Sequence, residues 1–264
     1  MIRTWRALLG RELARLAAGR VFLFGGLVAL LFLSIGGPAA IVGFLESRGD
    51  VVERAAELRA AIYGMTGGYS EALFLLAAIL GAMQIGSDIR AGTIFGVLAR
   101  PVSRRGIFLA GWTASACFLT TLELLRSAPF LAAADWLEGR ADLRSALGVI
   151  AIILGHWLTL AAFASLGAAL SPAYAALAGL ASVFVGGLAF SKSVGGVAGT
   201  LLDGLACLLP LPTKQESLIN AAISGSDPHV GPVLETILYR ASWTALLLVL
   251  GALWFERRNI APRV

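Results

Sequence analysis

Charged residues are scarce in this 264-residue chain: 14% are Asp, Glu, Lys or Arg, against about 25% in soluble domains. Hydrophobic residues make up 58% of the chain, and they gather in runs of about 18 or more, long enough to cross a bilayer as helices. This pattern predicts an all-α polytopic membrane protein. No long polar segment remains that could fold as a soluble catalytic domain, so such a module would belong to a partner.

Cysteine and histidine are also rare. Cys117 and Cys207 both lie in apolar surroundings, so we predict buried, hydrophobic side chains and no disulfide framework. The two histidines, His156 and His229, are too far apart for the HExxH motif of a zinc protease. The sequence therefore predicts no metal site.

A nucleotide-binding motif is missing as well. The chain has no GxxxxGK[ST] stretch, whose backbone would hold the phosphates of ATP. We therefore expect no enzyme and no cofactor within this chain. Its net charge of +5 does not indicate nucleic acid, because basic residues in a membrane protein first report topology.

Residues 1–20 predict an amphipathic helix at the membrane surface. Apolar side chains recur every three or four residues and fall on one helical face, whereas arginines fall elsewhere. The apolar positions are Ile2, Trp5, Leu9, Leu13 and Leu16. The alternative is a frayed basic flank to the first membrane span.

The rest of the chain, residues 21–264, predicts one transmembrane domain with six spans. Each expected span is near or above the roughly 20 residues that a helix needs to cross the hydrocarbon. They are residues 21–45, 69–87, 106–134, 146–170, 173–190 and 236–255.

Basic residues predict that both termini are cytoplasmic. With the N-terminus inside, twelve arginines face the cytoplasm and eight lysines or arginines face outward, while Arg126 lies within a span. Residues 194–211 are apolar but do not fit this topology as a seventh span, because a seventh span would move Arg257 and Arg258 outside. We expect this glycine-rich segment to enter the outer leaflet and turn back, or to lie along it.

A basic connector separates the second and third spans. "GSDIRAGTIFGVLARPVSRRG", residues 86–106, contains four arginines and an apolar patch. It predicts a short helix that begins near Thr93 and ends before Pro101. Docking on lipid headgroups is the alternative to docking on a protein.

The stretch "DIRAGTIFGVLARPVSRRGIFLAGW" resembles the ABC-2 type permeases, the membrane subunits of type-2 ATP-binding-cassette transporters. It looks closest to the branch that includes the permease serving nitrous oxide reductase maturation. The chain departs from the family in having Asp88 where Glu is common, and Ala110, Gly111 and Trp112 where a Gly-Lys-Trp triplet is common.

The resemblance implies a permease in the bacterial inner membrane that works as an exporter. Its implied partners are a cytoplasmic ATPase subunit that binds ATP and Mg²⁺, a second permease copy, the lipid bilayer and an accessory periplasmic or membrane protein. The residues that carry over to ATPase coupling are Asp88, Gly92, Thr93, Arg100, Pro101, Ser103 and Arg104.

Polar residues inside the expected spans are the other candidate sites. Glu123 and Arg126 are three apart and can pair on one helix face; the alternative is a place in a translocation path or a dimer seam. We expect His156 to be a hydrogen-bonded structural residue; the alternatives are a metal ligand and a place in the translocation path. Arg240, one turn into the last span, is expected to extend its side chain to the outer interface.

Two rival functions remain open. One is an intramembrane enzyme acting on lipid or peptide through Glu123, His156 or Asp203. The other is a non-transporting mechanical transducer coupled to the same kind of ATPase.

Overall fold

The computed structural model describes residues 2–18, 54–55, 73–84, 102–139, 142–169, 219 and 230–258. Within these ranges the chain is helical and contains no strand. The helices are α1 (Ile2–Ala18), α6 (Arg104–Glu138), α7 (Leu143–Ala169) and α11 (Gly231–Arg257), together with a shorter apolar helix, Leu73–Gln84. The predicted all-α class is confirmed for this part of the chain.

Three helices are long and apolar enough to cross a membrane. The 35 residues of α6 span about 52 Å, and the 27 residues of α7 and of α11 span about 40 Å each. These helices correspond to the predicted spans 106–134, 146–170 and 236–255. The Leu73–Gln84 helix falls within the predicted span 69–87, while spans 21–45 and 173–190 and segment 194–211 lie outside the described residues.

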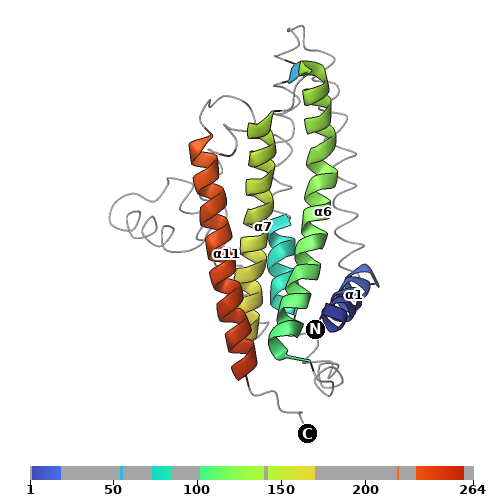
Figure 1. Cartoon of the computed structure of the whole chain (residues 1–264), viewed down its shortest axis with the longest axis vertical. Coiled ribbons are helices and arrows are strands. Elements are labelled where there is room, and N and C mark those ends of the chain that lie inside the picture. Colours follow the sequence, from blue (N-terminus) through green and yellow to red (C-terminus); the bar gives the residue numbers. More distant parts are fainter. Residues whose placement is uncertain are drawn as a thin grey trace, which may run out of the picture.

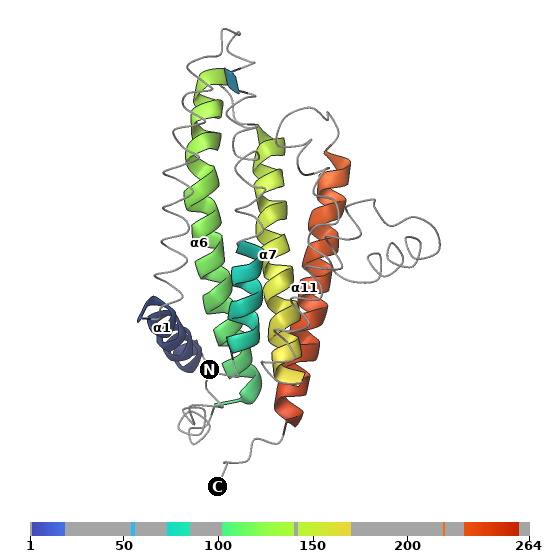
Figure 2. The same ribbon diagram turned by 180° about the vertical axis from the view of Figure 1, so that it is seen from behind.

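The long helices form a bundle in which α7 lies between α6 and α11 (Figure 1). Helix α6 runs in one direction, and α7 and α11 both return in the other. Figure 2 shows the same bundle from behind, with the Leu73–Gln84 helix beside α6 and α7. As a result, the start of α6 and the ends of α7 and α11 lie at the same end of the bundle as α1. We call this the α1 end.

Local hydrogen bonds define the hairpin between α6 and α7. Gly139 ends α6 in the left-handed conformation, with φ of 67°, which glycine adopts without steric cost. Asp142 then caps α7: its carboxylate accepts from the Arg144 amide at 3.2 Å and from the Ser145 hydroxyl at 2.7 Å. This short turn makes α6 and α7 antiparallel neighbours.

The main apolar core draws on four helices. Its largest side chains include Leu73, Phe108, Leu119, Leu160 and Phe255, each at most 1% exposed. Helix α1 packs beside α6, and its Leu16 contacts this core. The predicted N-terminal helix is therefore confirmed as a helix.

The prediction that Cys117 is buried is wrong. Its side chain is exposed on the surface of α6. Thr121, Leu124 and Ala128 follow it at helical spacing and are exposed too, so this face of α6 points away from the bundle. Apolar neighbours in sequence do not say which face of a helix packs inward, and Cys207 lies outside the described residues.

Candidate functional site

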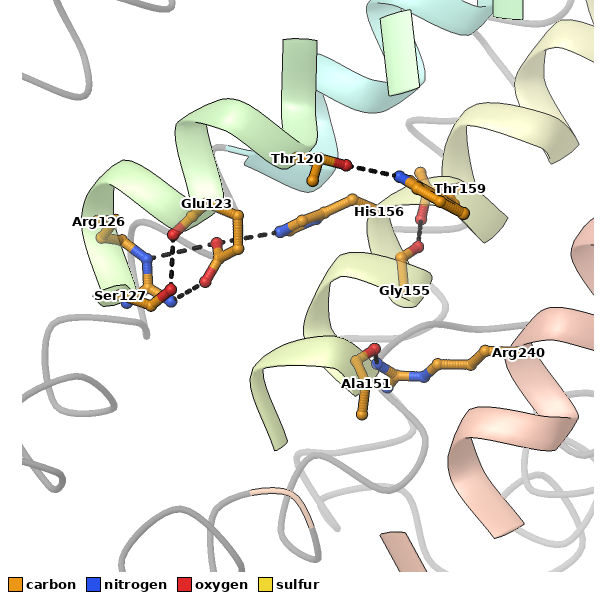
Figure 3. Close-up of polar contacts among 10 residues, drawn as sticks. Thr120, Glu123, Arg126, Ser127, Ala151, Gly155, His156, Thr159 and Arg240 are labelled. Atoms are coloured by element: carbon orange, nitrogen blue, oxygen red, sulfur yellow. Dashed lines mark hydrogen bonds and ion pairs between the residues drawn. The ribbon is translucent and has the colours of Figure 1, made fainter. Parts of the chain in front are cut away.

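An ion pair between Glu123 and Arg126 lies inside the bundle (Figure 3). The two residues are one turn apart on α6, and their side chains are 1% and 4% exposed. Arg126 binds the carboxylate in two places: Nη2 contacts Oε1, and Nε donates to Oε2 at 3.3 Å. The predicted pairing on one helix face is confirmed.

His156 brings α7 to the same carboxylate. Its Nε2 lies 3.5 Å from Oε2 of Glu123, an ion-pair contact when the imidazole is protonated. This distance is too long for a well-formed hydrogen bond, and neither ring nitrogen of His156 has a hydrogen-bond partner in the described structure. His156 is 1% exposed, and its ring also packs against Phe74, 4.6 Å between centroids. Its role as a structural residue stays a prediction.

Neighbouring hydrogen bonds hold this polar cluster of Glu123, Arg126 and His156 in place. The Ser127 hydroxyl donates to the Glu123 carbonyl at 2.8 Å, within α6. The Trp157 indole of α7 donates to Thr120 Oγ1 of α6 at 3.0 Å. The Trp157–Thr120 bond joins the two helices at the level of the cluster.

The cluster is balanced in charge and well suited to a low dielectric. An unpaired carboxylate or guanidinium near the bilayer centre costs roughly 2.5–3.5 kcal/mol, and each neutralises the other here. In the described ranges no three His, Cys, Asp or Glu side chains gather as metal ligands. The arrangement can join α6 to α7, and it can keep a charged carboxylate and a charged guanidinium stable inside the bundle.

Arg240 of α11 is buried, which corrects the expectation that it reaches an interface. Its side chain is 1% exposed, and Nη1 donates to the Ala151 carbonyl of α7 at 2.6 Å. Gly155 makes room for it, because a Cβ there would lie 2.7 Å from Nη1. A glycine on the neighbouring helix thus lets α11 turn this arginine inward.

The structure describes two of the predicted coupling residues, Ser103 and Arg104. Ser103 caps α6, its Oγ accepting from the Gly106 amide at 3.1 Å. Arg104 begins α6, and its Nη1 donates to the Arg258 carbonyl at 2.6 Å and to the Glu256 carbonyl at 3.3 Å. The other five, Asp88, Gly92, Thr93, Arg100 and Pro101, lie outside the described residues.

Two further residues at the α1 end were not predicted from sequence. Glu256 pairs with Arg105, whose Nε donates to Oε2 at 2.7 Å. Arg258 Nη1 donates to the Gly167 and Ala168 carbonyls of α7 at 3.0 and 3.2 Å. Their partners are about 90 to 150 positions away, so no local pattern could have indicated them.

Comparison with known proteins yields no match, either to a protein-family model or to a curated protein sequence.

Proposed function

We propose that this chain is the permease subunit of an ABC-2 type transporter that exports its substrate across the bacterial inner membrane. The working assembly contains two permease copies and two cytoplasmic ATPase subunits, with an accessory periplasmic or membrane protein as a further partner. Both termini of the permease face the cytoplasm. ATP and Mg²⁺ bind to the ATPase subunits.

The observation that carries this proposal is the continuity between the connector and a long helix. The residues that carry over to ATPase coupling end with Ser103 and Arg104, and these two residues cap and begin a 35-residue apolar helix. A push on the connector would therefore act directly on a helix of spanning length. Ser103 makes this junction stiff by satisfying an amide that the helix start would leave without a partner.

This geometry supports the following mechanism. ATP binding closes the two ATPase subunits, which displaces the connector of residues 88–105 and tilts α6. Packed helices respond by switching between two arrangements, since close-packed interfaces do not deform continuously. The switch opens a path for substrate along the seam between the two permease copies.

In this proposal the polar cluster keeps α6 and α7 in register during the motion. The Glu123 carboxylate is already occupied by Arg126, so it is poorly placed to act as a catalytic base. We therefore favour a transport role for the buried charges over intramembrane hydrolysis.

Co-expression with a candidate ATPase subunit from the same genome tests the proposal. The two chains should purify together in detergent, and Arg100→Glu should reduce both assembly and ATP turnover, because it reverses a connector charge without touching the described helices. Thr93→Ser, which keeps the hydroxyl that can cap the connector helix, serves as the control.

Failure of every candidate ATPase to purify with the wild-type chain would contradict the proposal. Retained ATP turnover in Arg100→Glu would contradict the coupling role of the connector. Loss of activity in His156→Ala alone, with ATPase binding unchanged and a lipid or peptide product formed only by the wild type, would favour the intramembrane enzyme instead.

A further inference from the structure

The structure assigns Arg104 and Arg258 an internal role, in which they join the end of the connector to α11 and α7 so that three helices move as one body. We call these contacts the arginine latch, formed by Arg104, Arg258 and the carbonyl groups that they bind. This inference rests on the proposed function and deepens it, because it states how motion reaches helices that the ATPase does not touch.

The first link joins α6 to α11. Arg104 is the first residue of α6, and its guanidinium donates to the carbonyls of Glu256 and Arg258. These carbonyls lie at the end of α11, where a helix leaves its last four C=O groups without internal partners. A cation at this position also interacts favourably with the helix dipole.

The second link joins α11 to α7. Arg258 directly follows α11, and its guanidinium donates to the carbonyls of Gly167 and Ala168 in the last turn of α7. Arg258 therefore accepts a bond from Arg104 on its backbone and donates bonds from its side chain. The latch is a continuous chain from α6 through α11 to α7.

Packing next to the latch makes the same end rigid. Phe108 of α6 lies 6.5 Å from Phe255 of α11, measured between ring centroids, and the Ser165 hydroxyl of α7 donates to the Leu247 carbonyl of α11 at 2.6 Å. The helix before the connector is held too, because Gln84 Nε2 donates to the Phe108 carbonyl at 2.6 Å. Both sides of the connector thus enter one rigid unit.

Arg105 provides a natural comparison. It neighbours Arg104 and carries the same charge, but among the described residues it binds only the Glu256 carboxylate, and the two side chains are 53% and 45% exposed. Exposed ion pairs of this kind contribute little to stability. If the connector arginines act only by attracting acidic groups, the two positions should behave alike; the latch predicts that they differ.

The test compares Arg104→Met, Arg258→Met and Arg105→Met in the complex of full-length permease with its ATPase. All three remove one charge, but only the first two cut the latch. We expect permease-dependent ATP turnover to fall about five-fold or more in Arg104→Met and Arg258→Met, and by no more than about two-fold in Arg105→Met. ATPase binding should persist in all three.

Spin labels then separate loss of transmission from loss of structure. One label is placed on the exposed native Cys117 of α6 and one on Ala169→Cys at the end of α7, with Cys207→Ala and with labelled subunits diluted by unlabelled ones. In the wild type the distance between labels should be the same with and without ATP. In Arg104→Met it should change on ATP binding, because α6 then moves without α7.

The outcomes are distinct. If no ATPase binds the wild type, the proposed function is overturned and the latch inference with it. If the complex forms but Arg104→Met and Arg258→Met behave like Arg105→Met in turnover and distance, the latch inference alone is overturned. Arg258→Met breaks the latch at its second link, between α11 and α7. It therefore tests the latch inference if Arg104→Met does not fold.

Discussion

At the level of single residues, the buried cluster centres on the carboxylate of Glu123, which both Arg126 and His156 contact. Arg126 satisfies the carboxylate from its own helix, and His156 approaches it from α7. Removing one member of a buried pair leaves an uncompensated charge, which costs more than removing both. The cluster is therefore expected to be strongly non-additive.

Arg126→Met should destabilise the protein by about 3–5 kcal/mol, because it leaves Glu123 charged and buried. The double variant Glu123→Gln with Arg126→Met should be much closer to the wild type, since both charges are gone. Reversible unfolding in detergent micelles measures the free energy of unfolding of the wild type, the two single variants and the double variant. Equal and additive losses would show that the two side chains do not interact.

A different residue-scale expectation concerns Arg240. Gly155→Ala places a methyl group 2.7 Å from Nη1 of Arg240, too close for the guanidinium to stay where it is. The guanidinium must then move from the Ala151 carbonyl, and overpacking of this kind typically costs about 1–3 kcal/mol. Arg240→Met combined with Gly155→Ala should relieve the clash, and unfolding measurements on single and double variants check this.

Close backbone approach organises the structure at the level of helices. Gly81, in the Leu73–Gln84 helix, faces α7: a Cβ there would lie 2.7 Å from the Leu160 carbonyl oxygen and 2.9 Å from the Ala164 nitrogen. Both are backbone atoms, which cannot rotate out of the way. Small residues at such crossings let membrane helices pack closely.

Gly81→Ala should therefore push the Leu73–Gln84 helix away from α7 and lower the free energy of unfolding by about 1–3 kcal/mol. Gly10→Ala in α1 is the matched control, because nothing lies within 4 Å of its added Cβ. That change should be neutral or stabilising by up to about 1 kcal/mol, as alanine favours helix over glycine. Similar melting temperatures for the two variants would contradict the close crossing.

At the scale of the whole molecule, the two ends of the bundle differ in charge. Four arginines, Arg104, Arg105, Arg257 and Arg258, gather at the α1 end beside Glu256. The sequence of the α6–α7 hairpin has three acidic residues, Asp135, Glu138 and Asp142, against two arginines, Arg140 and Arg144. Basic residues favour the cytoplasmic side of a membrane. This asymmetry supports the proposed orientation, with the connector in the cytoplasm.

Cysteine labelling tests that orientation in intact cells. Arg105 at the α1 end and Trp136 near the hairpin, which is 81% exposed, are replaced one at a time by cysteine in a chain with Cys117→Ala and Cys207→Ala. A membrane-impermeant maleimide should label Trp136→Cys in intact cells, and Arg105→Cys only after the membrane is opened. The reverse pattern would place the connector outside and would contradict ATPase coupling.

Sequence patterns predicted helices well and their faces less well. The spans 106–134, 146–170 and 236–255 agree with α6, α7 and α11 within a few residues, because a run of apolar residues long enough for the bilayer is a local property. Pairing of Glu123 with Arg126 was predictable for the same reason, since a spacing of three residues along one helix brings two side chains together. Cys117 and Arg240 were misplaced because the packing of the helices decides which face of each is buried, and no local pattern encodes that choice.

The amino-acid sequence by itself determined that this chain is apolar and helical, where its helices of spanning length lie, and which buried charges share a helix turn, since each depends only on composition and short spacing. The tertiary structure decided that His156 meets Glu123, that Arg240 turns inward at Gly155, and that Arg104 and Arg258 bind the ends of α11 and α7. The physical reason is that a guanidinium or imidazole finds its partner across helices brought together by packing, and no short-range pattern encodes which carbonyl or carboxylate that packing will present.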